Sequence, residues 1–177
     1  MLNKILTLLA DGQFHSGEEV GQALGVSRAA VWKHMKKLDE LDIPYSSVKG
    51  RGYRLQDDIE LLDEKRIQEA LSQRLDILEI LLDVNSTNTY LFERAADHMG
   101  KRYAVLAEKQ VGGRGRRGRQ WVSPFGKNIY LSLLTSFAGG VASLEGLSLM
   151  TAIAVEKAMA RLGVGDIGLK WPNDVYA

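Results

Sequence analysis

Four arginines and four glycines fill the eight positions from Gly112 to Arg119, and such a run can hold an anion. Guanidinium groups present paired N–H donors that match a carboxylate or a phosphate. The glycines let the backbone approach a ligand closely, because they carry no side chain. Composition alone leaves three uses open: a phosphate-holding loop, an RNA-binding arginine–glycine segment and a solvated surface loop.

Two common nucleotide-binding motifs can be tested against this run. Gly113-Arg-Gly-Arg-Arg-Gly118 matches the G-x-G-x-x-G pattern of dinucleotide-binding folds, which must open a helix whose N-terminus meets the pyrophosphate. The chain instead continues Arg119-Gln-Trp-Val-Ser-Pro124, and no acid stands about twenty residues on to bind a ribose. A P-loop needs Lys and then Ser or Thr after its last glycine, whereas Arg119 and Gln120 stand here. Both motifs are therefore excluded.

The basic residues of this nearly neutral chain gather in two regions. The 177 residues carry a formal net charge of +1, yet eight Lys or Arg residues face one acid in 101–127, and seven face three acids in 28–54. Two separate positive regions indicate two separate anionic partners.

Several classes of protein and site are excluded by what the chain lacks. It has no cysteine, which excludes disulfides, thiolate metal ligands and a cysteine nucleophile. His15 and His34 have no ligands at metal-binding spacing, so no metal site is predicted. No segment reaches the length of a membrane span, and the N-terminus lacks the pattern of a signal peptide. We therefore predict a cytoplasmic protein without a membrane partner.

The first third of the chain has the pattern of a winged helix-turn-helix. Helices are predicted over 2–10 and 17–24, and a third begins after Ser27 as N-cap, with Val31, Met35 and Leu38 as its buried stripe. Two short strands around a turn at 49–52 then form the wing. The predicted DNA contacts are Ser27, Arg28, Ala29, Trp32, Lys33, Lys36, Lys49 and Arg51. A protein-interaction module is the alternative that such a fold leaves open.

After a polar stretch at 56–58 the pattern becomes that of a mixed-sheet α+β domain. Strands are predicted over 77–82, 103–107, 128–136 and 167–171, and helices over 63–73, 87–99 and 143–162. We therefore predict two domains, a winged helix-turn-helix at 1–57 and a sheet domain at 58–177.

Three ordered motifs resemble the signatures of biotin protein ligases. The first is Asn85-Ser-Thr-Asn88, which resembles the family's substrate-binding segment. The second begins at Glu108-Lys-Gln110 and continues through 113–121 and Ser123-Pro-Phe-Gly126 to 128–132. The third is Lys170-Trp-Pro-Asn-Asp174. The DNA-binding front end resembles the bifunctional class that is both ligase and biotin operon repressor. The resemblance covers nearly all of the chain and implies a class II synthetase-like catalytic domain behind the winged helix-turn-helix.

The resemblance implies an activity and partners. Biotin and ATP, with Mg²⁺ carried by the nucleotide and no tightly bound cofactor, would give biotinyl-adenylate and pyrophosphate. Biotin would then pass to a lysine of the biotin carboxyl carrier protein. The bound adenylate would promote a homodimer that binds operator DNA and represses biotin synthesis genes. A ligand-responsive repressor without catalysis and an RNA-binding protein are the two alternatives.

The resemblance also implies roles for single residues in the upstream part of the site. Ser86, Thr87 and Gln110 have the small donors and acceptors that grip a neutral ureido ring, while Asn88 either helps them or caps the following helix. The catalytic Arg114 and Arg116 would hold the carboxylate and the α-phosphate and neutralise the charge that builds between them, in a loop that Gly113 and Gly115 keep close to the ligand.

Further roles fall around the downstream motif. The catalytic Lys170 would meet phosphate, and Asn173 belongs to the same substrate-binding motif. Asp174 would pair with a loop arginine or orient the metal ion of the nucleotide. Trp121 is expected to stack on adenine, with packing against the closed loop as the alternative.

This sequence departs from the family in two places. Trp32 stands where a small polar residue is usual for base reading, so no operator sequence is predicted. The family continues beyond the Lys170–Asp174 motif with further strands, a second essential lysine and a small barrel. The catalytic domain is therefore expected to be incomplete here, and the chain to be truncated.

Overall fold

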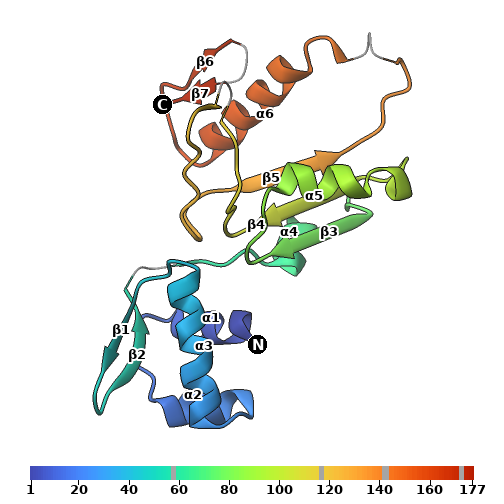
Figure 1. Cartoon of the computed structure of the whole chain (residues 1–177). Coiled ribbons are helices and arrows are strands. Elements are labelled where there is room, and N and C mark those ends of the chain that lie inside the picture. Colours follow the sequence, from blue (N-terminus) through green and yellow to red (C-terminus); the bar gives the residue numbers. More distant parts are fainter. Residues whose placement is uncertain (57–58, 116–117, 141–143, 172–173) are drawn as a thin grey trace. The chain divides into compact units, whose positions relative to one another are not determined.

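The computed structural model describes residues 1–56, 59–115, 118–140, 144–171 and 174–177, in two compact units, Met1–Thr135 and Ser136–Ala177 (Figure 1). The domain boundary predicted between residues 57 and 58 falls outside the described residues and stays a prediction. Among the described residues, no helix is both long enough and apolar enough to cross a membrane.

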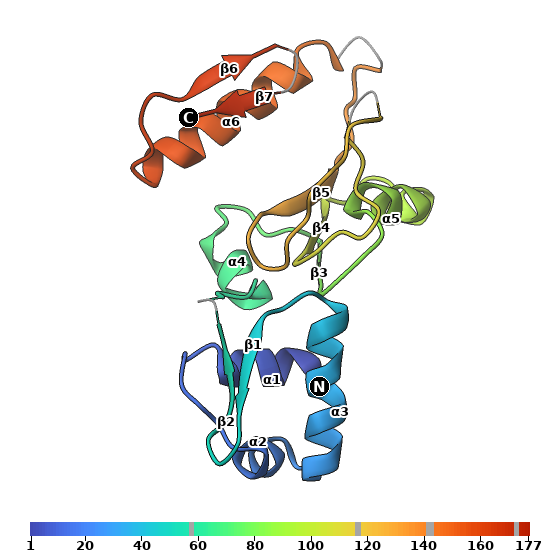
Figure 2. The ribbon, with the colours of Figure 1, turned by 60° about the vertical axis from the view of Figure 1, so that its left-hand side comes forward.

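The first unit begins with three helices and a hairpin (Figure 2). The helices are α1 (Leu2–Leu9), α2 (Gly17–Leu24) and α3 (Arg28–Glu40), and the hairpin pairs β1 (Tyr45–Val48) with β2 (Gly52–Leu55) antiparallel. Their apolar faces form one core that includes Ile5, Leu9, Val20, Val31, Met35 and Leu38. The predicted winged helix-turn-helix and the buried stripe of its third helix are confirmed.

Local hydrogen bonds set the ends of these helices. Ser16 and Glu19 form the capping box of α2, and the hydroxyl of Ser27 accepts from the N–H of Ala30 at 3.2 Å. At the other end of α3, Asp42 takes the left-handed conformation at φ 56°, and the N–H of Ile43 donates to the carbonyl of Leu38 at 2.9 Å. This arrangement ends the helix as a Schellman motif.

The wing is tied to the segment between α1 and α2. The N–H of Tyr53 donates to the carbonyl of His15 at 2.8 Å, and the N–H of His15 returns a bond to Tyr53 at 2.9 Å. Gly52 has φ 100°, and a Cβ there would overlap the carbonyl oxygen of His15. The close pairing of the wing with this segment therefore requires glycine at position 52.

The rest of the first unit is built on a three-stranded mixed sheet in the order β3-β4-β5. Strand β3 (Ile77–Leu81) runs parallel to β4 (Tyr103–Ala107), and β5 (Tyr130–Leu134) pairs antiparallel with β4, in which every residue is buried. Helix α5 (Thr87–Arg94) lies along β4 and β5, and α4 (Glu64–Ala70) lies near β3 (Figure 1).

Three elements of the first unit differ from the prediction by two or more residues at an end. Helix α4 ends at Ala70 rather than at 73, because Leu71 has extended backbone angles. Helix α5 ends at Arg94, where three-residue hydrogen bonds tighten the chain into a 3-10 turn, Ala96–His98, instead of continuing to 99. Strand β5 is shorter at both ends than the predicted 128–136, since only 130–134 pair with β4.

The second unit contains helix α6 (Leu147–Arg161) and a small hairpin of β6 (Gly168–Lys170) and β7 (Asp174–Tyr176). The helix begins at Leu147 after a left-handed Gly146 and without a side-chain cap, so the predicted start at 143 is wrong. Ser143 itself lies outside the described residues. Strand β7 was not predicted, because three residues are too few to show a two-residue alternation.

Candidate functional site

A chain of hydrogen-bonded polar side chains joins α5, β5 and the end of β4. Thr87, only 3% exposed, donates its N–H to Gln110 Oε1 at 2.8 Å, and its hydroxyl lies 3.1 Å from the same oxygen. On its other side, Thr87 Oγ1 is 2.9 Å from Ser132 Oγ. Ser86 acts as the N-cap of α5, accepting from the N–H of Thr89, and so fixes the start of the helix that presents Thr87.

The direction of these bonds follows from their chemistry. A backbone N–H can only donate, so the Gln110 atom that faces Thr87 must be the amide oxygen. When the single hydroxyl proton of Thr87 goes to this oxygen, Ser132 must supply the proton between the two hydroxyls. The cluster then has the Gln110 NH₂ group at one end as a donor and the Ser132 oxygen at the other as an acceptor. It can therefore meet a neutral ligand that has both a carbonyl and N–H groups.

The arginine–glycine run begins as a continuation of the β3–β4 ladder. The N–H of Val111 donates to the carbonyl of Val84 at 2.9 Å, and the N–H of Gly112 donates to that of Asn85 at 2.8 Å. A Cβ on Gly112 would overlap the side chain of Asn85, and one on Gly113 would overlap the Trp121 indole. These two glycines are therefore needed for close packing at the point where the loop leaves the sheet.

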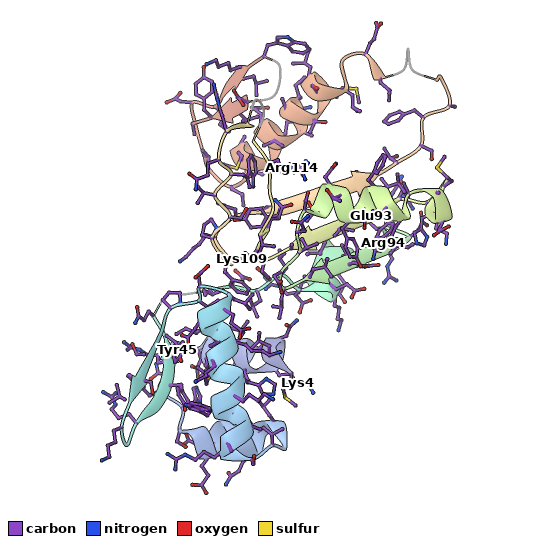
Figure 3. The ribbon with its side chains drawn as sticks, in the orientation of Figure 1. Lys4, Tyr45, Glu93, Arg94, Lys109 and Arg114 are labelled. Carbon is purple, nitrogen blue, oxygen red and sulfur yellow. The ribbon has the colours of Figure 1, made fainter. Side chains whose placement is uncertain are left out.

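The structure brings several of the predicted site residues together and leaves others untested. Gln110 and Thr87 are in direct contact. Arg114, labelled in Figure 3, is exposed, and Gly115 donates its N–H to the Arg119 carbonyl at 3.2 Å. Arg116 and Asn173 lie outside the described residues. The predicted roles of these residues stay predictions.

The structure bears on the alternative roles that the sequence left open for Asn88 and for Trp121. Asn88 is exposed in the first turn of α5, and Ser86 caps that helix, so the possibility that Asn88 is the cap is wrong. Trp121 packs on the backbone of Gly113 and is 51% exposed as a residue, so the packing contact is present and adenine stacking stays a prediction.

The downstream motif lies in the second unit. Lys170 of β6 and Asp174 of β7 are paired directly across the hairpin, and both are exposed. This register places an ammonium and a carboxylate on neighbouring strands, while their predicted roles toward phosphate and metal stay predictions.

Three further residues of the site region had no role assigned from the sequence. Ser132 lies two residues after the buried Tyr130 and so on the same, inward face of β5, and its hydroxyl contacts Thr87 of α5. Glu108, 3% exposed, accepts from the N–H of Leu62 at 2.7 Å; burial raises the pKa of its carboxyl, and that hydrogen bond opposes the rise. Lys109, labelled in Figure 3, donates to the carbonyl of Leu41 at 3.0 Å and to the carboxylate of Asp42 at 2.5 Å. The contacts of Glu108 and Lys109 join residues far apart in the chain, so the sequence alone could not predict them.

A second network holds α5 on the sheet. The carboxylate of Glu79 on β3 accepts from the hydroxyls of Tyr90 at 2.6 Å and Tyr103 at 2.7 Å. Burial by itself would raise the pKa of Glu79, but the two phenol donors outweigh it and lower the pKa. Arg94, labelled in Figure 3, stacks on the Tyr90 ring with its guanidinium 3.5 Å from the centroid. This network fixes the helix that carries Thr87.

The winged helix-turn-helix presents the predicted DNA-binding residues to solvent. Arg28, Ala29, Trp32, Lys33 and Lys36 are exposed on α3, and Lys49 and Arg51 are exposed in the wing. The guanidinium groups of Arg51 and Arg54 lie 4.3 and 4.8 Å from the centroid of the Phe14 ring, which holds them on the wing. Cations gathered on one helix face and the adjoining turn suit a polyanion.

Among the described residues there is no group of three or more His, Asp or Glu side chains that could hold a metal ion.

Comparison with known proteins gives matches over both parts of the chain. Residues 82–177 match the biotin/lipoate A/B protein ligase family, and residues 1–54 match an HTH domain. The chain is 43% identical to the bifunctional ligase/repressor BirA of Salmonella typhimurium and 42% identical to that of Escherichia coli, over 97% and 98% of this chain and 53% of each relative. It thus spans about half the length of these curated relatives. A solved biotin protein ligase from Leishmania major in complex with biotin matches 55% of this chain and 45% of that chain, with 28% identity and a TM-score of 0.48.

Proposed function

Because the chain belongs to the biotin/lipoate A/B protein ligase family, we propose that its sheet part binds biotin and ATP, forms biotinyl-adenylate and transfers biotin to a lysine of a carboxyl carrier protein. The predicted fold class, a winged helix-turn-helix followed by a mixed-sheet ligase domain, is confirmed by the two family matches. The observation that carries the proposed activity is the hydrogen-bonded chain from Gln110 through Thr87 to Ser132, next to the start of the arginine–glycine loop.

The ureido ring of biotin is neutral and has one carbonyl between two N–H groups. The Gln110 NH₂ group can donate to the carbonyl, and the Ser132 oxygen can accept from an N–H. Thr87 holds both partners in place, and its burial keeps water from competing for these bonds.

The arginines of the loop would act on the charged part of the reaction. The carboxylate of biotin attacks the α-phosphate of ATP, so a new bond forms between a carboxylate oxygen and phosphorus while pyrophosphate leaves. Two anions must approach each other in this step, and Arg114 and Arg116 would offset their repulsion. Lys170 would contribute a further positive charge, and Mg²⁺ would arrive with the nucleotide.

The test of the ligand site is calorimetric titration of the chain with biotin. We expect Thr87→Val to weaken biotin binding at least tenfold, because it removes the hydroxyl that joins Gln110 to Ser132. Each tenfold loss corresponds to about 1.4 kcal/mol. Thr7→Val is the matched control, since Thr7 lies exposed on α1 and its hydroxyl donates to the carbonyl of Asn3 in the same helix. Equal affinity of the wild type and Thr87→Val would refute the proposed site.

Catalysis needs a separate assay. The chain is incubated with biotin, ATP and a carboxyl carrier protein, and the carrier is weighed by mass spectrometry. Addition of one biotin supports the ligase activity. Biotin binding without transfer would instead favour the ligand-responsive repressor.

We further propose that the winged helix-turn-helix binds operator DNA, as a homodimer when biotinyl-adenylate is bound. The exposed cations of α3 and the wing support this proposal. The test is fluorescence anisotropy with duplexes selected by the chain from a random library. Lys49→Ala and Arg51→Ala should each weaken binding to all sequences and lower the salt slope by about 1, whereas the exposed Lys65→Ala should not.

A further inference from the structure

The recognition helix α3 carries one large aromatic side chain among its exposed cations. Trp32 is 55% exposed, although its neighbours Val31 and Met35 are buried. Packing of the winged helix-turn-helix core therefore does not require an indole at this position. The ring stands among exposed cations on α3, so a polyanion that binds these cations would also meet its apolar surface.

The surroundings of Trp32 define which part of the ring is available. Lys36 follows one turn later, and its Nζ lies 4.2 Å from the centroid of the indole ring. The ammonium covers one face of the ring by a cation–π interaction, while about half of the Trp32 surface stays open to a ligand. Ala29 precedes Trp32 by three residues on the same exposed face, and its small side chain leaves room beside the ring.

We propose that Trp32 is a specificity-determining residue that contacts the 5-methyl group of a thymine in the major groove. This inference rests on the proposed DNA-binding function of the winged helix-turn-helix. Among the groups that base pairs present in the major groove, the thymine methyl is the apolar one, while the others are hydrogen-bond donors or acceptors. An indole lying in the groove can meet this methyl with the exposed surface of its ring. The bases stay stacked in this contact, so the cost of unstacking, a few kcal/mol, is avoided.

The roles on α3 then divide by chemistry. Arg28 and Lys33 contribute charge, which attracts phosphate whatever the sequence. Trp32 contributes an apolar surface that distinguishes thymine from the other bases. Lys36 holds the ring in one orientation, so that little side-chain entropy is lost when the contact forms.

The experiment compares thymine with uracil, which lacks only the methyl group. Duplexes that the full chain selects from a random library are synthesised again with single thymines replaced by uracil, and the dissociation constants are measured by fluorescence anisotropy. At one position of each half-site we expect uracil to weaken binding by wild type about fourfold, the factor that corresponds to about 0.8 kcal/mol for one methyl group. With Trp32→Ala, the ratio of the dissociation constant of the uracil duplex to that of the thymine duplex should fall to about 1.

Controls separate this role from a structural one. Arg28→Ala should weaken binding to both duplexes equally and keep the fourfold ratio, since it removes a cation and leaves the indole of Trp32 in place. Trp32→Phe keeps an aromatic ring and should retain a ratio above 1, which also covers the case in which the alanine variant does not fold.

The outcomes also separate this inference from the function on which it rests. Intact DNA binding with a ratio of 1 at every thymine would overturn the role of Trp32 and leave the DNA-binding function standing. Sensitivity to 7-deazapurines instead of uracil would assign the indole N–H to a purine N7, and would likewise overturn the methyl contact. Absence of DNA binding would refute the proposed function itself.

Discussion

Lys109 is a sensitive point in the first unit, because its side chain joins the end of β4 to the C-terminus of the recognition helix. Its ammonium donates to the carbonyl of Leu41 at 3.0 Å and meets the carboxylate of Asp42. The Leu41 carbonyl belongs to the last turn of α3, where helix carbonyls have no intrahelical partner. The Lys109→Met substitution keeps most of the apolar stem and removes the charge.

The expected cost can be worked out contact by contact. Asp42 is 84% exposed, so its ion pair with Lys109 contributes at most about 1 kcal/mol. The Lys109 side chain is 12% exposed and Leu41 9%, so loss of the ammonium leaves a largely buried carbonyl without its donor, at a cost of about 1–3 kcal/mol. We expect Lys109→Met to lower the free energy of unfolding by about 2 kcal/mol, and Asp42→Asn by less than about 1 kcal/mol.

Urea denaturation followed by far-ultraviolet circular dichroism measures both values. Lys65→Met is the matched control, because Lys65 is 84% exposed and its carboxylate partner Glu69 lies 3.9 Å away. It should change the free energy of unfolding by less than about 0.5 kcal/mol. Amide exchange adds a local measurement: the N–H groups of Asp42 and Ile43 close the end of α3 and should exchange faster in Lys109→Met.

Two results would refute this reasoning. Stability of Lys109→Met equal to that of the wild type would mean that the Leu41 carbonyl needs no donor. An equal loss in Asp42→Asn and Lys109→Met would assign the whole effect to the ion pair instead.

Three further changes have expected results. Gly52→Ala should lower the free energy of unfolding, measured by urea denaturation, by roughly 3 kcal/mol, because the backbone has a positive φ and the new Cβ would overlap its neighbours. Gly50→Ala should lower it much less, because Gly50 has a positive φ but lies in open space. Equal losses would contradict this. Tyr103→Phe removes a donor from Glu79 and should cost about 1 kcal/mol at pH 7. The lowered pKa of Glu79 stabilises the fold above the ordinary glutamate pKa, so this cost should shrink as the pH falls through the lowered value; a pH-independent cost would speak against it. Because the pKa of Glu108 is raised, the free energy of unfolding should fall as the pH rises from the ordinary glutamate pKa to the raised value. Glu108→Gln should therefore be more stable than the wild type toward pH 8, and this difference should disappear near pH 4. A difference that grows on acidification would contradict the sign of this shift.

The sequence by itself determined the elements whose signals are local. Capping residues and apolar spacing placed the three helices of the winged helix-turn-helix, because a helix is closed by hydrogen bonds between residues at most four apart. The apolar run at 103–107 predicted β4 with its correct ends. The ordered motifs identified the family, since the residues that carry the resemblance are contiguous in the chain.

Only the tertiary structure decided how distant residues meet. The β4–β5 register, with Val105 opposite Ser132, brings Ser132 to Thr87 across 45 positions of sequence. The contact of Lys109 with Leu41 spans 68 positions and joins two segments whose local patterns are independent of each other. The early end of α4 and the strand β7 were also missed, because short elements depend on neighbours more than on propensity. The local code therefore named the parts of the candidate site, and strand register decided which of their side chains touch.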